Sequence, residues 1–532
     1  MTTSAGPAES AGVAEQIDAN QPVRTSVVLD KTSGTGPKPA TETGTSTLRR
    51  AASALAHRVG AATVVFAVLA TVFGAAFAVS TPPFWGHDEI TQFGRAYQVA
   101  HGGLLPERIP DTRGISYGGD VPVSITDLMG YALTDYTTNP QEPDPMVADP
   151  AAYDRFKSAE VSTAMEPVWF TNTAAYSPIP YLPAAVGIQA AEALGLEVGG
   201  MIMATRLAGL AVYLALVGLG LWALRRHRVQ WLVLAVALLP IAVFQAGTVT
   251  ADTMTNALAI MVSALLVKAL FLGDRLGWVE TTALLAAAVL LPLSKPTYVL
   301  LAMLVVLVPA GRFAFGAGSW QRFVPWVFAG TGAVCFAVWT KIAGPTTEGM
   351  GLMRPEHQWK SVRPGDQLSG ILGDPVGFLS VFGDSISYRD QRWFIQFFGE
   401  LGFAYIDVPA LSIVACLLAF AVALGISDRM TGSTRWRTWV AALTVAASVA
   451  MIYVTLYMSF TPVGYYIIDG VQGRYFVPLA ILAFAVLLRW MPLRLTDIEG
   501  RTPAVGPAVT VAVASAIGLI AAVAKYHSVV WG

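Results

Sequence analysis

Charged side chains are scarce in this sequence. Only 13% of its 532 residues are Asp, Glu, Lys or Arg, while 54% are hydrophobic. Soluble domains carry about 25% charged residues, so this chain has too few to cover a water-soluble globule. The net charge of −1 supplies no positive field for nucleic acid. We therefore predict an integral membrane protein with no nucleic-acid partner.

Cysteine and metal-binding motifs are also rare. Cys335 and Cys416 are the only cysteines, and both fall in apolar runs, where we expect them to pack as small buried side chains. The sequence has no Walker A motif, no HExxH and no CxxC, so we expect neither an ATP-driven pump nor a zinc site. We predict no metal and no cofactor. Glu142, Asp144 and Asp149, in a proline-rich stretch, form the one place where a divalent cation is an alternative.

Apolar runs of about 20 residues, the length that crosses a bilayer core, dominate the sequence instead. They predict an all-α polytopic membrane protein with about eleven transmembrane helices. The predicted spans are 60–80, 201–224, 229–247, 252–272, 277–294, 297–315, 322–342, 408–426, 438–460, 474–491 and 504–524. The stretch 178–196 is a twelfth candidate, broken by Pro178, Pro180 and Pro183.

The distribution of arginine decides whether that stretch crosses. Lys and Arg gather on the cytoplasmic side of membrane proteins. If 178–196 does not cross, every arginine cluster falls on one side, together with Arg49, Arg50 and Arg58 before the first span. We therefore predict a juxtamembrane or re-entrant segment at 178–196, a cytoplasmic N-terminus and a multi-pass location in the inner (plasma) membrane.

This topology divides the chain into six parts. The Thr-, Ser- and Gly-rich start lacks the apolar content needed for a core, and we expect no signal peptide before the first span. The predicted parts are a disordered cytoplasmic tail (1–55), the first transmembrane helix (56–80), an acidic extracytoplasmic loop with amphipathic and juxtamembrane helices (81–200), a transmembrane bundle (201–342), a second extracytoplasmic loop (343–407) and C-terminal transmembrane helices (408–532).

The first candidate site follows the first span, in the sequence FWGHDE at 84–89. From Asp88 onward the apolar residues recur with helical spacing, which predicts an amphipathic helix lying flat on the membrane with Ile90, Phe93 and Tyr97 facing down. One interpretation is that Asp88 only caps this helix. The alternative is a carboxylate at the membrane boundary that acts as a general base, with Glu89 beside it. Arg95, on the polar side, is a further substrate-binding candidate.

Two cations stand at span ends on the side where basic residues are disfavoured. Lys295 lies in LPLSKP, and Arg474 lies in DGVQGRYF with Gln472 and Tyr475 beside it. Lys295 either snorkels to the headgroups or contacts a phosphate. Arg474 either forms a structural pair with Asp469 or another loop acid or binds a phosphate. Asp252, at another outer span end, either pairs with these cations or helps to bind a polar substrate. The glycines of GVQGR would allow the backbone to approach a ligand.

Several stretches are similar to a known family. They are PPFWGHDEITQFGRAYQVAHGGLLP, YSPIPYLPAAVGI, RLAGLAVYLAL, LLPIAVFQAGTVTADTMTNAL, LSKPTY and GVQGRYFVPLAIL. The chain resembles the predicted membrane proteins called domain of unknown function 2142 (DUF2142) and, more broadly, the GT-C superfamily of polytopic glycosyltransferases. One departure is that Gly86-His87 precedes the acids, where the family usually has a proline-rich approach, and Gln92 stands near its usual histidine.

This resemblance implies a GT-C-like fold and a glycosyltransferase that uses a polyprenyl-phosphate sugar on the extracytoplasmic face. It implies that Asp88 is the catalytic acid position and that Arg474 and Lys295 contact the lipid phosphate. The expected partners are a lipid-linked sugar donor, a glycan or protein acceptor of the cell envelope, and membrane lipid. Two alternatives are a transporter or flippase of a lipid-linked or anionic solute, and a non-catalytic envelope-assembly protein.

Overall fold

The computed structural model describes residues 58–111, 114–138, 145–403, 405–491, 493 and 505–532. The predicted tail (1–55), and with it Arg49 and Arg50, lies outside these residues, as do Glu142 and Asp144. The first helix, α2 (Ala61–Ser80), is apolar throughout and has no charged residue in either terminal turn. At about 1.5 Å per residue its 20 residues reach across a bilayer core.

Seven helices among the described residues are long and apolar enough to cross a membrane. They are α2, α7 (Val198–Ala223), α10 with its π-helical end η2 (Ala251–Leu272), α13 with its 3-10 extensions η6 and η7 (Gln321–Met353), α17 (Arg435–Ser459), η9 with α18 (Gly473–Trp490) and α19 (Val505–Trp531). Each coincides with a predicted span. The prediction of an all-α, multi-pass membrane protein is therefore confirmed.

The four other predicted spans are shorter elements. Three coincide with short apolar helices: α11 (Trp278–Ser294), α12 with its flanking 3-10 turns η3 and η4 (Pro296–Leu307), and α16 (Ala410–Ile426). The fourth is broken into α8 (Gln230–Ala237) and α9 (Pro240–Ala246), because Pro240 has no N–H to continue the α8 hydrogen-bond ladder. The count of eleven spans stays a prediction.

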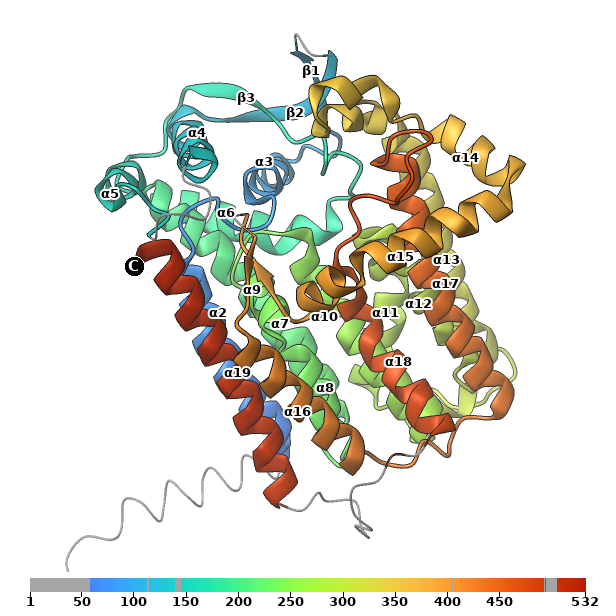
Figure 1. Ribbon diagram of the computed structural model, residues 1–532. Coiled ribbons are helices and arrows are strands. Elements are labelled where there is room, and N and C mark those ends of the chain that lie inside the picture. The colour runs from blue at the N-terminus through green and yellow to red at the C-terminus, as the bar shows by residue number, and fades with distance from the viewer. Residues whose placement is uncertain (1–57, 112–113, 139–144, 404, 492, 494–504) are drawn as a thin grey trace, which may run out of the picture. The chain divides into compact units, whose positions relative to one another are not determined.

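The helices pack side by side along much of their length (Figure 1). α19 lies between α2 and α16, α7 packs on α2, α6 and α10, and α10 also contacts α11 and α18. α10 is the most enclosed of the long helices, since 89% of the residues in its most apolar 18-residue stretch are buried. Side chains at its N-terminus are therefore held by protein on all sides. Cys416 on α16 is buried, whereas Cys335 on α13 is half-buried.

The segment 81–200 folds over one end of these helices. Its elements are α3 (Glu89–Ala100), β1 (Glu107–Asp111), β2 (Gly114–Pro122), α4 (Val123–Thr138), α5 (Pro150–Lys157), β3 (Met165–Trp169), η1 (Ile179–Tyr181) and α6 (Leu182–Ala193). The strands form an antiparallel sheet in the order β1-β2-β3, with Gly118 opposite both Glu107 and Trp169. The sequence analysis did not predict this sheet.

Two expectations about this segment meet different outcomes. α6 has 12 residues, about 18 Å, which is too short to cross a bilayer, as predicted for 178–196. That α3 lies flat on the membrane stays a prediction, but its polar face is not exposed to water. α3 packs against α6 and β2, and Phe93 and Tyr97 on one side and Gln92 and Arg95 on the other are all buried. Protein covers both faces of this helix.

The second loop, 343–407, is also largely helical. After η7 it contains η8 (Glu356–Ser361), α14 (Pro364–Gly373), α15 (Pro375–Phe398) and the short strands β4 (Glu400–Leu401) and β5 (Ile406–Asp407). α15 begins at Asp374, whose side chain accepts a hydrogen bond from the Gly377 N–H at 2.8 Å. Its C-terminal part packs against η9, which brings the second loop to the start of α18.

The last helix, α19, continues seven residues beyond the predicted end at 524. Its final turn contacts the first loop: the N–H groups of Met146 and Val147 donate to the carbonyl oxygens of Val529 and Val530, both at 3.0 Å. The indole of Trp531 donates to the carbonyl oxygen of Ser80 at 2.6 Å. The end of the last span thus supports the end of the first one.

Candidate functional site

Asp88 occupies a backbone conformation that most residues avoid. Its φ of 53° and ψ of 23° lie in the left-handed region, which Asp and Asn tolerate better than other side chains. Asp88 stands at the N-cap position of α3, but its side chain makes no capping hydrogen bond. The interpretation that Asp88 only caps the helix is therefore wrong. Unfavourable backbone conformations of this kind often occur at functional sites.

Asp88 and three charged side chains from three other elements lie close together. Lys295 Nζ lies 2.6 Å from Asp252 Oδ1, and Arg474 Nε lies 3.6 Å from Asp252 Oδ2. Arg474 Nη2 lies 3.8 Å from Asp88 Oδ2. We call Asp88, Asp252, Lys295 and Arg474 the charge cluster. The sequence analysis singled out all four residues separately, and the fold brings them together.

Each member of the charge cluster stands at the end of a helix. Asp252 is in the first turn of α10 and Lys295 follows the last residue of α11. Arg474 is the second residue of η9, the 3-10 turn that leads into α18. Asp252 also accepts a hydrogen bond from Gln245 Nε2 at 2.8 Å, which fixes its second oxygen. The cluster therefore lies at one end of the helix bundle and not halfway along it.

Arg474 is buried but its guanidinium is incompletely bound. The side chain is 7% exposed, and its Nε and Nη1 atoms have no hydrogen-bond partner in the part of the chain that the structure describes. Its distances to both carboxylates exceed normal hydrogen-bond length. A buried donor without a partner costs about 1–3 kcal/mol, and more when it is charged. A ligand oxygen that accepted from these atoms would recover that energy.

A second buried arginine shows what a fully bound guanidinium looks like. Arg206 on α7 donates from Nε and Nη2 to the two carboxylate oxygens of Glu89, at 2.8 and 2.6 Å. It also donates to the carbonyl oxygens of Ala78, Thr81 and Pro82 at 2.7–2.9 Å. All five of its donor positions are used. Arg206 has a structural role, in contrast to Arg474.

The partners of Glu89 set it apart from Asp88. Its carboxylate is fully buried and also accepts from the N–H groups of Gly86 at 3.0 Å and Val249 at 2.9 Å. Both oxygens are thus occupied, and neither contacts the charge cluster. This geometry favours a structural role for Glu89, which fixes the start of α3 against α2 and α7.

Arg95 also lies away from the charge cluster. It donates from Nη1 to Gln98 Oε1 at 2.5 Å and from Nη2 to the carbonyl oxygens of Leu104 at 2.7 Å and Tyr176 at 3.3 Å. It therefore ties the end of α3 to the segment before α6. Sequence periodicity placed Arg95 on the polar face of the helix, but it gave no information about which loop covers that face.

The DGVQGRYF segment contributes more than Arg474. The centroid of the Tyr475 ring lies 4.3 Å from Lys295 Nζ and 5.6 Å from the guanidinium carbon of Arg474. Tyr298 donates to the Tyr475 carbonyl oxygen at 2.7 Å. The Gln472 side-chain oxygen is buried and has no partner among the residues described. Tyr475 therefore contacts both cations of the charge cluster.

The glycines of this segment serve the protein's own packing. A Cβ at Gly473 would lie 1.9 Å from the carbonyl oxygen of Trp393 on α15, and Gly470 has a φ of 83°. The expectation that these glycines leave room for a ligand is thus corrected for Gly473, because α15 fills that space. Asp469 pairs with Arg354 at 2.7 Å and not with Arg474, so the alternative of an Asp469–Arg474 pair is also wrong.

The charge cluster changes the proton affinity of the groups around it. Burial raises the pKa of Asp88 above its ordinary value, although the nearby Arg474 opposes this effect. Burial and Arg474 together hold the pKa of His87 well below its usual range. His87 is thus neutral, and its Nδ1 atom is buried without a partner in the described structure. A carboxylate with a raised pKa binds a proton more readily, as a general base requires.

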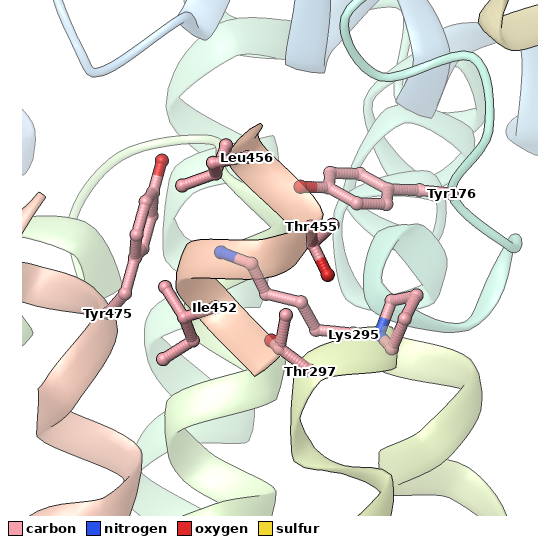
Figure 2. A pocket seen from close by; sticks show the side chains of 8 residues that line it. Tyr176, Lys295, Thr297, Ile452, Thr455, Leu456 and Tyr475 are labelled. Atoms are coloured by element: carbon pink, nitrogen blue, oxygen red, sulfur yellow. The ribbon is translucent and has the colours of Figure 1, made fainter. Parts of the chain in front are cut away.

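The charge cluster links two cavities. Lys295 and Tyr475 line the first, of about 100 Å³, together with Tyr176, Pro296, Thr297, Ile452, Thr455 and Leu456. We call it the lysine cavity. Figure 2 shows the Lys295 amino group beside the Tyr475 ring, with Ile452, Thr455 and Leu456 on the neighbouring α17. α17 is a candidate membrane span, and only 22% of its most apolar 18-residue stretch is buried, so this cavity borders a helix with a large exposed apolar surface.

The second cavity has a volume of about 310 Å³, and Asp88 lines it together with residues of α3, α4 and β3. We call it the aspartate cavity. It also includes Phe403 and Met353 from the second loop. The two large loops thus enclose one space, with the carboxylate of Asp88 in its wall.

Sequence reasoning missed several residues that build the site. Arg206 lies inside an apolar run, and an ionisable residue in such a run is itself a signal of a specific partner. Gln245 donates to Asp252 of the charge cluster and His87 directly precedes Asp88, but neither stands in a recognisable motif. No group of three or more His, Cys, Asp or Glu side chains that could hold a metal ion occurs in the described ranges.

Comparison with protein families supports the membrane architecture, whereas comparison with individual proteins finds no match. No curated protein and no solved structure matches the chain. The family described as predicted membrane protein (DUF2142) matches residues 71–483, a range that includes the whole charge cluster and both loops. The chain therefore belongs to the DUF2142 family of predicted membrane proteins.

Proposed function

We propose that this protein is a membrane glycosyltransferase that transfers a sugar from a polyprenyl-phosphate carrier to an acceptor hydroxyl of an envelope glycan or protein. The observation that carries the proposal is the convergence of Asp88, Arg474 and Lys295. Arg474 lies 3.8 Å from Asp88 and 3.6 Å from Asp252, and Asp252 in turn lies 2.6 Å from Lys295. A carboxylate and two cations at one end of the helix bundle support this proposal, in which the carboxylate is the base and the cations bind the phosphate.

The proposed reaction inverts the sugar configuration. Asp88 accepts the proton of the acceptor hydroxyl, whose oxygen attacks the anomeric carbon of the donor. The bond between that carbon and the phosphate oxygen breaks, and its electron pair leaves with the polyprenyl phosphate. Arg474, whose Nε and Nη1 atoms have no hydrogen-bond partner among the described residues, stabilises the negative charge that develops there. No metal or nucleotide is needed for this step.

The lysine cavity suits the phosphate end of the lipid donor. It combines one ammonium group with apolar side chains such as Ile452 and Leu456, and it borders α17, which has a large exposed apolar surface. A polyprenyl phosphate has the same combination of an anionic head and an apolar chain. Glu89 has no part in this mechanism, because Arg206 and two backbone N–H groups occupy its carboxylate.

The topology proposed from the sequence belongs to the same hypothesis. In it the chain has eleven spans, a cytoplasmic N-terminus and a GT-C-like first loop on the extracytoplasmic side of the inner membrane. The opposite ends of α7 support this arrangement. Val198 adjoins the first loop, whereas Arg225, Arg226 and Arg228 follow the other end.

A transporter is less well supported than a transferase. Ionisable residues of a transport pathway gather near the middle of the membrane. Asp252 and Arg474 are each the second residue of their span, and Lys295 directly follows α11. Charges at the ends of helices fit a reaction at the membrane boundary better than passage through it.

The direct test is Asp88→Asn in the full-length protein. Asn keeps the size of the side chain and tolerates the left-handed backbone, so the fold should be retained. We expect transfer to fall by about 10²–10⁴-fold, the usual contribution of a general base. Unchanged glycan output with normal amounts of folded protein would remove Asp88 from the mechanism.

A further inference from the structure

The aspartate cavity has the size of a small-molecule site. Its volume of about 310 Å³ falls at the lower end of the range of about 300–1,000 Å³ for ligand pockets. Its walls come from α3, α4 and β3 of the first loop, and Met353 and Phe403 of the second loop complete them. The helix α17, which borders the lysine cavity, contributes no residue to it.

Three aromatic side chains line the wall. Trp169 on β3, Tyr136 on α4 and Phe403 all line the cavity, and the Tyr136 and Phe403 rings lie 4.5 Å apart. Trp169 is 37% exposed, so the cavity reaches the surface beside it. Flat apolar rings next to a few polar groups match a sugar ring, which has apolar C–H faces and hydroxyl groups around its edge.

Polar groups are placed at separate points of the same wall. The Asn172 Oδ1 atom is buried and has no hydrogen-bond partner within the described residues, so a ligand hydroxyl that donated to it would satisfy it. Burial, chiefly, and the Tyr405 and Asp88 side chains raise the pKa of the Tyr136 hydroxyl. Tyr136 therefore stays protonated and can donate a hydrogen bond.

The position of Asp88 identifies which substrate the cavity would hold. Asp88 lines the aspartate cavity, whereas Lys295 and Tyr475 line the lysine cavity. If the donor phosphate binds the cations, the group that gives its proton to Asp88 approaches from the other side. This step rests on the proposed function.

We propose that the aspartate cavity binds one sugar ring of the acceptor, stacked on Trp169 and hydrogen-bonded to Tyr136 and Asn172, with the reacting hydroxyl at Asp88. The acceptor is thus a glycan end or a glycosylated molecule. An acceptor that presents a protein side chain would have no use for the stacking surface and the amide.

Gly130 gives a way to block this cavity without disturbing the fold. It lies on α4, lines the cavity, and a Cβ there would meet no atom within 4 Å. Gly130→Leu therefore places a side chain in the cavity and improves the helix propensity of α4. Gly383→Leu is the matched control, because Gly383 lies in α15, has equally open space and does not line the cavity.

The experiment measures binding of methyl glucosides, galactosides and mannosides to the full-length protein in nanodiscs by saturation-transfer NMR. We expect at least one glycoside to bind, and Gly130→Leu and Trp169→Ala to weaken its affinity by about tenfold or more, with Gly383→Leu unchanged. The proposal is overturned if no glycoside binds, or if Gly130→Leu binds as well as Gly383→Leu.

The two proposals fail in different ways. If Asp88→Asn abolishes transfer while Gly130→Leu leaves glycoside binding intact, the transferase stands and the acceptor cavity is overturned. If Gly130→Leu abolishes glycoside binding while Asp88→Asn transfers normally, the sugar site stands without the mechanism.

Discussion

Asp88 and Glu89 are neighbours in the chain, but their carboxylates contact different arginines. Asp88 Oδ2 lies 3.8 Å from Arg474 Nη2, whereas Glu89 Oε2 lies 2.6 Å from Arg206 Nη2. The left-handed backbone at Asp88 separates the two side chains. One acid is locked into the scaffold, and the other keeps a carboxylate oxygen at the wall of a cavity.

The raised pKa of Asp88 predicts the pH dependence of transfer. A general base acts only when deprotonated, so the rate should rise with pH as the carboxyl loses its proton. Because burial raises this pKa, the acid limb should have its midpoint above the ordinary value of about 3.9. A pH–rate profile of kcat measures it, with Asp88→Glu expected to move the midpoint.

Glu400 supplies the control for this profile. Burial raises its pKa as well, and it accepts hydrogen bonds from Arg392 and Gln396. Of the groups that shift the pKa of Glu400, Arg474 of the charge cluster has the smallest effect. The acid limb should stay in place in Glu400→Gln. If the acid limb moved in Glu400→Gln and not in Asp88→Glu, Asp88 would not be the group that sets the acid limb.

Replacing Arg206 should affect stability more than any exposed charge. Arg206→Met leaves Glu89 buried without its cation, and breaking a buried ion pair costs about 3–5 kcal/mol. We expect a large fall in the apparent Tm of the purified protein and less protein in the membrane.

Arg155→Met is the matched comparison. Its pair with Asp149 is 3.4 Å long and both side chains are more than half exposed, so its loss should cost no more than about 1 kcal/mol. Equal apparent Tm values for the two variants would show that the buried pair does not hold the first loop.

Arg474→Lys should slow the chemical step. Lysine keeps the charge but lacks the planar fork that would bind two phosphate oxygens. We expect kcat to fall by about 10²–10³-fold, as for the loss of one preorganised donor, while Lys295→Met mainly raises KM for the lipid donor. Steady-state kinetics separates the two effects.

Arg389→Lys is the control for this pair of variants. Arg389 is partly exposed and lies 3.5 Å from Asp469, which is not in the charge cluster. Its kinetics should match the wild type. If the kinetics of Arg474→Lys also match those of the wild type, Arg474 does not bind the phosphate.

Cysteine labelling tests the topology. In a Cys335→Ala, Cys416→Ala background, we expect Ala151→Cys in α5 to react with a membrane-impermeant maleimide in intact cells. Arg226→Cys, beyond the other end of α7, should react only after permeabilisation. Both positions are exposed, so the reverse pattern would place the first loop in the cytoplasm.

The sequence predicted the spans well because each span is a local property. All seven long helices coincide with runs of apolar residues. The break at Pro240 was readable in principle, since proline interrupts the helical hydrogen-bond ladder. The three-stranded sheet was missed because β2, GISYGGDVP, has few of the β-branched and aromatic residues that favour strands.

The candidate site was predicted only in part, because its contacts join distant segments. Position at span ends was enough to select Asp252, Lys295 and Arg474. The roles of Glu89 and Arg95 depend on Arg206 and on the segments that cover α3, and these are long-range contacts. Helical periodicity indicates which face is polar, but not whether water or protein lies against it.

The contact between α19 and the first loop constrains the order of assembly. Met146 and Val147 reach their carbonyl partners only at Val529 and Val530, and Trp531 reaches back to Ser80. During synthesis, these bonds cannot form until residues 529–531 have left the ribosome, long after the first span and the first loop have done so. A chain that stopped before residue 529 would still contain all the spans before α19. It would lack the hydrogen bonds that hold Ser80, Met146 and Val147 ahead of α3 and α5.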